Sequence, residues 1–194
     1  MTQTVGYRAT APGAPLERFS FPRREMRRDD VTVRVSHCGV CHSDLSAVRM
    51  SEADGGRFPV TPGHEFVGTV VAVGDDVGSF AVGDPVAVGN IVDSCGACDM
   101  CRVGQENFCR EFPTLTYGGT DRHDGSVTLG AFSADYVVRD HFVYHLPAAL
   151  DPAEVAPLMC AGITVWEPLR RWNVGPGVRV GVAGVGGLGH LAVK

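Results

Sequence analysis

The stretch Cys95-Gly-Ala-Cys98-Asp-Met-Cys101-Arg-Val-Gly-Gln-Glu-Asn-Phe-Cys109 is the most informative part of this chain. Short C-x-x-C steps let neighbouring thiolates converge on one ion, and the longer return to the last cysteine closes a tetrahedral site. The pattern therefore favours a closed four-cysteine zinc site. An iron–sulfur cluster fits less well, because the ferredoxin run closes sooner and adds a proline, whereas Arg110 follows Cys109. A disulfide pair is the remaining alternative.

Composition limits the class of protein. The 194 residues include seven cysteines, and this odd number suits metal ligation in a reducing compartment better than a secreted disulfide framework. The formal net charge of -5 provides no basic face for nucleic acid. Residues 1–30 lack the apolar core of a signal peptide, and the longest apolar run, residues 180–193, is too short to span a bilayer. We therefore expect a cytoplasmic protein that binds neither nucleic acid nor membranes.

The first three quarters of the chain have the pattern of short β-strands. Valines alternate with polar residues over residues 31–35, which indicates a half-buried strand. Valine-rich runs at 67–73 and 86–88 are separated by glycine-containing turns, and residues 131–146 return to strand character after a polar loop at 114–130. Short strands with turn signals at this spacing predict a small barrel.

The periodicity changes after residue 150. Asp151-Pro-Ala-Glu predicts a helix start, with an acidic N-cap and proline in the first turn, and a helical pattern continues to Trp172. An apolar strand is expected at residues 178–183. It leads into Gly184-Val-Gly-Gly-Leu-Gly189, which fits G-x-G-x-x-G and opens another expected helix. A glycine turn between a strand and a helix is what binding a dinucleotide pyrophosphate requires.

A doubly wound sheet needs more βα units than follow this glycine turn. We therefore expect the chain to be the N-terminal portion of a longer protein. We also expect residues 178–194 to be poorly supported, because the apolar strand has no neighbour to pair with.

The motifs together are similar to those of the zinc-dependent medium-chain alcohol dehydrogenases, and most closely to the cinnamyl-alcohol-dehydrogenase branch. The resemblance runs from about residue 31 to the last residue and covers about half of a full family member. It rests on these motifs in this order: Gly39-Val-Cys-His-Ser-Asp44, Pro62-Gly-His-Glu65, the four-cysteine lobe, Cys160-Ala-Gly-Ile-Thr164, and the glycine turn.

The resemblance implies a mainly β GroES-like barrel with a zinc lobe, followed by the first βα unit of a truncated Rossmann (α/β) domain. The implied boundaries are residues 1–160 for the GroES-like catalytic domain, with the structural lobe at 95–109, and residues 161–194 for the incomplete dinucleotide-binding domain. It also implies hydride transfer between primary alcohols and aldehydes, two zinc ions, NADP in preference to NAD, and a homodimer of the full-length form. The chain alone is expected to be inactive. The alternative is a non-catalytic zinc-binding module that cannot bind the cofactor.

The resemblance also assigns site residues. The catalytic zinc would be held by Cys41, His64 and Cys160, with Glu65 approaching it during ligand exchange, and the structural zinc by Cys95, Cys98, Cys101 and Cys109. Asp44 would orient His64, and Ser43 would exchange a proton with the substrate oxygen. The cofactor would contact His42, Thr164, Gly184, Gly186, Gly187, Leu188 and Gly189. Ser46 stands where many relatives have a proton-relaying histidine. Ile91 is a candidate for lining the substrate pocket.

Several other side chains receive no functional role. The arginines Arg23, Arg24, Arg27 and Arg28 are interpreted as a solvated face, and Cys38 as an unligated thiol. Surface or packing roles are assigned to the histidines His37, His123, His141, His145 and His190.

Overall fold

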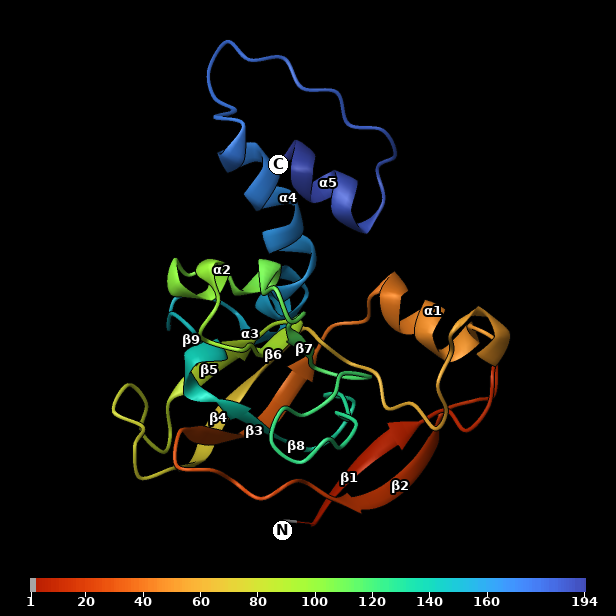
Figure 1. Ribbon diagram of the computed structural model, residues 1–194. Coiled ribbons are helices and arrows are strands. Elements are labelled where there is room, and N and C mark those ends of the chain that lie inside the picture. Colours follow the sequence, from red (N-terminus) through yellow and green to blue (C-terminus); the bar gives the residue numbers. More distant parts are fainter. Residues whose placement is uncertain (1–2) are drawn as a thin grey trace.

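A computed structural model of the chain describes residues 3–194 (Figure 1). The strands are β1 (Gln3–Arg8), β2 (Glu17–Pro22), β3 (Asp30–Cys38), β4 (Phe66–Val73), β5 (Pro85–Val88), β6 (Ile91–Asp93), β7 (Thr114–Leu115), β8 (Asp135–Arg139) and β9 (Val143–His145). The α-helices are α1 (His42–Arg49), α2 (Asp99–Arg102), α3 (Pro152–Val155), α4 (Ala161–Arg171) and α5 (Gly187–Val193). Short 3-10 turns are η1 (Glu52–Asp54), η2 (Glu106–Phe108), η3 (Asp140–Phe142) and η4 (Ala156–Met159).

The central element is a curled antiparallel sheet of five strands in the order β8-β3-β4-β5-β9. The hairpin β1–β2 lies at one end of it, and the pair β6–β7 connects it to the cysteine lobe (Figure 1). The expected mainly β, GroES-like architecture is confirmed, with the barrel present as this curled sheet. The hairpin was not predicted, because residues 3–22 lack the alternating valines that marked β3.

Packing on both faces of β4 sets the position of the C-terminal helices. Val31 and Val33 of β3 are fully buried and form one core with Val70 of β4, as the alternation predicted. Val67 points to the opposite face of β4 and packs with Val155 of α3 in a second cluster. This second core holds α3 and η4 against the sheet, so the chain that follows begins α4 at a fixed point. In Figure 1, α4 and α5 then extend away from the sheet.

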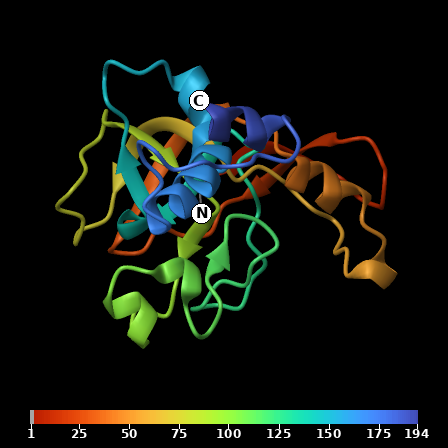
Figure 2. The same cartoon turned by 90° about the horizontal axis from the view of Figure 1, so that it is seen from above.

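The strand expected at residues 178–183 is not formed. This segment is irregular and exposed, and it connects α4 to α5 as a long loop (Figures 1 and 2). A run of β-branched residues becomes a strand only where a neighbour accepts its backbone hydrogen bonds, and within residues 3–194 none lies alongside. The helix after the glycine turn does form, as α5.

Arg23 contradicts the interpretation of the arginines as a solvated face. It is only 6% exposed, and its guanidinium donates hydrogen bonds to the backbone carbonyls of Leu129, Gly130 and Asp135 and to the hydroxyl of Ser133. Burial lowers the pKa of Arg23 to about 10. The side chain therefore ties the end of β2 to the turn before β8. The amino-acid composition could not predict the burial of Arg23, because the sequence does not show which backbone carbonyls are buried and need a hydrogen-bond donor.

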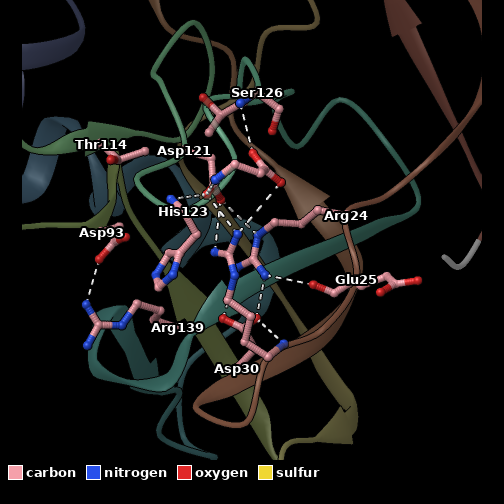
Figure 3. A network of polar contacts seen from close by, with 12 residues as sticks. Arg24, Glu25, Asp30, Asp93, Thr114, Asp121, His123, Ser126 and Arg139 are labelled. Carbon is pink, nitrogen blue, oxygen red and sulfur yellow. Dashed lines mark hydrogen bonds and ion pairs between the residues drawn. The ribbon is translucent and has the colours of Figure 1, made fainter.

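Arg24 and Arg27 are also paired inward. Arg24 forms an ion pair with the fully buried Asp30 (Figure 3). Arg27 pairs with Asp121 at 2.7 Å between Nη2 and Oδ1. Arg28 alone of the four is mostly exposed, and it pairs with acidic residues in the β4–β5 turn. A buried carboxylate is stable only with a partner of opposite charge. Arg24 therefore holds the start of β3 through Asp30, and Arg27 holds the 121–126 loop through Asp121.

None of the helices between residues 3 and 194 is long and apolar enough to cross a membrane.

Candidate metal centres

Cys41 occupies the start of α1, where a helix leaves backbone N–H groups without partners. It is the N-cap residue, and its Sγ accepts from the N–H of Ser43 at 3.5 Å. The carboxylate of Asp44 reaches back to the N–H of Cys41, with 2.9 Å between N and Oδ2. This reciprocal capping box fixes the thiol at the end of β3.

His64 lies in a fully buried loop before β4. The Oδ1 atom of Asp44 accepts from the N–H of Gly63 at 2.9 Å and lies 3.0 Å from Nδ1 of His64. Gly63 has a φ of +100°, and a Cβ there would lie 2.5 Å from the backbone nitrogen of Phe132, so glycine is required. Since Nδ1 donates to Asp44, Nε2 is left with its lone pair available to a metal.

Cys160 brings the third ligand from the start of α4. Its Sγ lies 3.9 Å from Sγ of Cys41, and the ligand atoms of Cys41, His64 and Cys160 all lie within 4.8 Å of one another. Tetrahedral zinc with Zn–S bonds of about 2.3 Å separates two sulfurs by about 3.8 Å. The donor set and its spacing therefore fit zinc held by three protein ligands.

The electrostatics of this cluster suit a cation. Burial alone would lower the pKa of His64, but the hydrogen bonds to Asp44 and Cys160 outweigh it and raise this pKa to about 10. For Cys41, burial opposes ionisation, yet the hydrogen bonds from Ser43 and Cys160 and the charge of His64 hold the pKa below its usual value. In the metal-free chain, the imidazole of His64 therefore holds a proton beside the sulfur atoms of Cys41 and Cys160. A divalent metal ion bound by these three residues would replace that proton.

Glu65 is buried beside this cluster without joining it. Its carboxylate does not belong to the set of ligand atoms, from Cys41, His64 and Cys160, that lie within 4.8 Å of one another. It packs against Gly39, where a Cβ would lie only 2.6 Å from Oε1 of Glu65. Burial raises the pKa of Glu65 to about 7. The predicted approach of Glu65 to the metal would therefore need a movement of this side chain.

The other predicted site residues differ in how deeply they are buried. Ser43 is exposed, with its hydroxyl 3.6 Å from Sγ of Cys41. His42 and Thr164 are exposed, and Thr164 donates its hydroxyl to the carbonyl of Cys160 at 2.7 Å. Ser46 lies further along α1, so no imidazole follows Ser43 on this helix. Ile91 is half-buried against the sheet core.

Tyr117 was missed by the sequence analysis, although it contacts the cluster. Its ring lies 5.7 Å from that of His64 between centroids, in an edge-on arrangement with 60° between planes. The only sequence signal was an aromatic residue in the polar loop 114–130.

The four cysteines of the lobe also converge. Sγ of Cys101 lies 3.8 Å from that of Cys95 and 3.5 Å from that of Cys98, and the four ligand atoms lie within 4.8 Å of one another. These separations are near tetrahedral zinc spacing and far above the S–S bond length of about 2.05 Å. Backbone N–H groups of Arg110 and Cys101 lower the pKa of Cys98 to about 6, which favours the thiolate that a metal binds.

A further cavity lies away from the metal cluster. It has a volume of about 880 Å³ and lies between the lobe and the loop 111–123, bordered by Asp93, Arg122 and Arg139. None of Cys41, His64 and Cys160 lines it.

The glycine turn, residues 184–189, follows the last residue of the metal cluster in the sequence and is exposed at the surface. Gly184 has a φ of +84°, which favours glycine, and Gly186 caps the start of α5. Side chains at Gly186 and Gly187 would meet open space, and Leu188 is exposed. Gly189 approaches the carbonyl of Gly184 too closely for a Cβ. Helix α5 rests against α4 (Figure 1).

Comparison with known proteins places these features in a family. The model of the family described as "Alcohol dehydrogenase GroES-like domain" matches residues 27–148. A probable cinnamyl alcohol dehydrogenase 8D of Oryza sativa subsp. japonica is 47% identical over 196 residues, covering 100% of this chain and 53% of the relative. The chain thus spans about half the length of the curated relatives it matches. The alignment includes residues before 31, so the resemblance begins earlier than predicted.

Solved structures agree with this result. A cinnamyl alcohol dehydrogenase (SbCAD4) from Sorghum bicolor superimposes with a TM-score of 0.95 at 42% identity, covering 100% of this chain and 55% of the other. The protein described as CAD from Helicobacter pylori, solved in complex with NADP(H), gives a TM-score of 0.93 at 37% identity, covering 99% of this chain and 55% of the other. The predicted resemblance to this branch is confirmed.

Proposed function

The chain belongs to the alcohol dehydrogenase GroES-like domain family, and we propose that it is the metal-binding catalytic part of an oxidoreductase that interconverts primary alcohols and aldehydes. The observation that carries the proposal is the convergence of Cys41, His64 and Cys160 within 4.8 Å. Two thiolates and one imidazole are the ligands of an open, catalytic zinc site, whereas the lobe offers the four thiolates of a closed, structural one. The proposal therefore includes two zinc ions with different roles.

Zinc bound at Cys41, His64 and Cys160 would supply Lewis acidity to the oxygen of an alcohol or aldehyde. The side chains around it prepare the site. Asp44 accepts the Nδ1 proton of His64, which presents Nε2 to the metal position. Ser43 stands at the exposed rim, where its hydroxyl exchanges a proton between the substrate oxygen and solvent. Because α1 has Ser46 where many relatives have a histidine, the proton leaves Ser43 through water or through a second side chain.

The cofactor part of the proposal rests on the C-terminal residues. Gly184, Gly186, Gly187, Leu188 and Gly189 would approach the pyrophosphate at the start of α5, and His42 and Thr164 would contact the cofactor from the metal side. NADP(H) is preferred over NAD because the similar Helicobacter pylori enzyme was solved with NADP(H). The proposed division is a catalytic domain at residues 1–160 and the first unit of a dinucleotide-binding domain at 161–194.

Metal content tests the first part of this proposal. After exhaustive dialysis, the purified chain should contain two zinc ions, and C160S should contain one. The matched control is C38S, which removes a thiol outside both ligand groups and should keep two. One zinc in the unaltered chain would contradict the catalytic site while leaving the lobe intact.

Cobalt substitution tests whether the site is open. Cobalt has visible absorption that reports its ligands, so azide should shift the bands assigned to Cys41, His64 and Cys160 and leave those of the lobe unchanged. Absence of any shift would mean that the fourth position is filled by protein. Such a closed site would contradict a catalytic role.

One observation favours the alternative of a non-catalytic zinc-binding module. Residues 178–183 form no strand, so the glycine turn lacks the sheet that positions it in dinucleotide-binding domains. Titration with NADPH, followed by its fluorescence, separates the two. Saturable binding supports the oxidoreductase, and its absence with both zinc ions present supports the module.

A further inference from the structure

Ser94 carries a buried hydroxyl at the point where the chain leaves β6 and enters the four-cysteine lobe. It lies directly before Cys95, and the residue is only 4% exposed. A buried hydroxyl needs a hydrogen-bond partner, because it has lost those that water would supply. Its partner is Cys101 of α2, with 3.4 Å between Oγ and Sγ. The side chain of Ser94 therefore points at one of the four sulfur atoms of the lobe.

The backbone of Ser94 is fixed from the side of the sheet. Its N–H donates to Oδ1 of Asp93 at 2.8 Å, and the same oxygen lies 2.6 Å from Nη1 of Arg139 at the end of β8 (Figure 3). Nε of Arg139 donates in turn to Asp29 at 2.9 Å. Asp93 is 7% exposed, and hydrogen bonds between charged groups are among the stronger ones. The position of Ser94 is thus set by the sheet as well as by the lobe.

The other three sulfur atoms of the lobe each accept a hydrogen bond from the backbone. The N–S distances are 3.4–3.5 Å, and the pairs are Cys95 with the N–H of Cys98, Cys98 with that of Arg110, and Cys109 with that of Cys95. A sulfur that binds a metal does so as a thiolate, and donors around it stabilise the negative charge. The hydroxyl of Ser94 is placed to do this for the fourth sulfur, that of Cys101.

The direction of the hydrogen bond between Ser94 and Cys101 depends on the metal. In the metal-free chain, the thiol of Cys101 donates to Oγ of Ser94. Zinc and cobalt bind cysteine as the thiolate, which has no proton and can only accept. A serine hydroxyl is both donor and acceptor, and its hydrogen rotates to suit the partner. With a metal in the lobe, the same two atoms are therefore joined by a hydrogen bond from Ser94 to the thiolate.

We propose that Ser94 is a positioning residue of the four-cysteine site, whose hydroxyl donates to the metal-bound thiolate of Cys101. This inference rests on the proposed function, because it concerns the zinc ion of the lobe. The hydrogen bond holds Cys101 in place and draws electron density from its sulfur. It also connects the metal site to β8 through Asp93 and Arg139. Contacts of this kind contribute about 10–100-fold to metal affinity.

The experiment compares S94A with the unaltered chain by competition for cobalt against a chelator of known affinity. S94A removes one oxygen atom and leaves the backbone contact with Asp93 in place. We expect roughly tenfold weaker binding at the lobe, by the effect of outer contacts on metal ligands, with unchanged binding at the open site. The sulfur-to-cobalt charge-transfer bands of the lobe should move to longer wavelength, because the sulfur of Cys101 holds its electrons less tightly without the hydroxyl.

S133A is the matched control. Ser133 also has a partly buried hydroxyl, which accepts from Arg23 and donates to backbone carbonyls outside the lobe. S133A should therefore leave the affinity and the bands of the lobe unchanged. Recording the spectra again in a C160S background, which removes a ligand of the open site, assigns the remaining bands to the lobe. Thermal unfolding of each metal-free variant accompanies these measurements.

The inference is wrong if S94A binds cobalt at the lobe as the unaltered chain does, or binds it more weakly with unmoved bands. It is also wrong if both sites weaken equally, or if S133A moves the lobe bands as far as S94A does, because either result would indicate a general loss of packing. If the unaltered chain holds no metal in the lobe, the proposal of two zinc ions fails, and the inference fails with it. If only the open site stays empty, the catalytic proposal fails, while S94A still decides the inference at the lobe.

Discussion

Replacing Asp44 by asparagine tests how much one carboxylate contributes to both the fold and the metal site. Three N–H groups, from Cys41, Gly63 and His64, donate to it over 2.9–3.0 Å. An asparagine amide has one acceptor oxygen and one NH₂ donor group. If its oxygen faces Gly63 and His64, its NH₂ faces the N–H of Cys41. In the flipped orientation, the NH₂ group of the asparagine faces the two N–H groups of Gly63 and His64 instead.

The magnitude follows from these contacts. The better orientation leaves one buried N–H without an acceptor, which costs about 1–3 kcal/mol, and the His64 contact loses about 1 kcal/mol because its acceptor is no longer charged. The expected loss is therefore about 2–4 kcal/mol in the free energy of unfolding of the metal-free D44N variant. For a chain of this length, that corresponds to a fall in Tm of about 5–15 °C. Zinc affinity at the open site should fall roughly 10–100-fold.

The assay is thermal and urea unfolding of the metal-free chain, followed by zinc competition. The control is D151N, which removes the same charge from an exposed N-cap of α3. Asparagine and aspartate cap helices about equally well, so D151N should lie within about 0.5 kcal/mol of the unaltered chain. A D44N variant that melts with D151N and keeps its zinc affinity would refute the reasoning.

Three further predictions concern buried or crowded positions. R23M should destabilise the chain by about 3–5 kcal/mol in urea unfolding, because it leaves several buried carbonyls without their donor; a change below 1 kcal/mol would contradict this. G39A should displace the Glu65 carboxylate, which a Cβ would approach to 2.6 Å, and a crystal structure with that carboxylate unmoved would contradict the prediction. Diamide should link Cys41 to Cys160, 3.9 Å apart between sulfurs, in the metal-free chain and not in the zinc-loaded one. Peptide mass mapping checks this, and equal linkage in both forms would exclude a shared metal.

The local features of this fold were predictable because their signals lie close together in the sequence. Two-residue steps between Cys95, Cys98 and Cys101 place three thiols on one short turn, whatever the rest of the chain does. The alternating valines of β3 likewise specified which side chains face the core. In both cases the spacing itself carries the geometry.

The open metal site could not be derived in this way. Cys41, His64 and Cys160 come from the end of β3, a buried loop and the start of α4, and only the sheet topology brings them together. Their assignment came from the resemblance to a family. Tyr117 and Arg23 show the same limit, because their partners His64 and Gly130 are distant in sequence and leave no periodic pattern.

Helix α1 connects the folding of this region to its chemistry. Cys41 and Asp44 form the capping box that starts the helix, and the same two side chains provide a proposed metal ligand and the partner of His64. The first turn of α1 therefore cannot unwind without separating Asp44 from His64. Since the helix has only eight residues, too few to be stable alone, its start depends on these contacts. A metal ion at this site would stabilise the helix, and a well-capped helix would in turn hold the metal ligands in place.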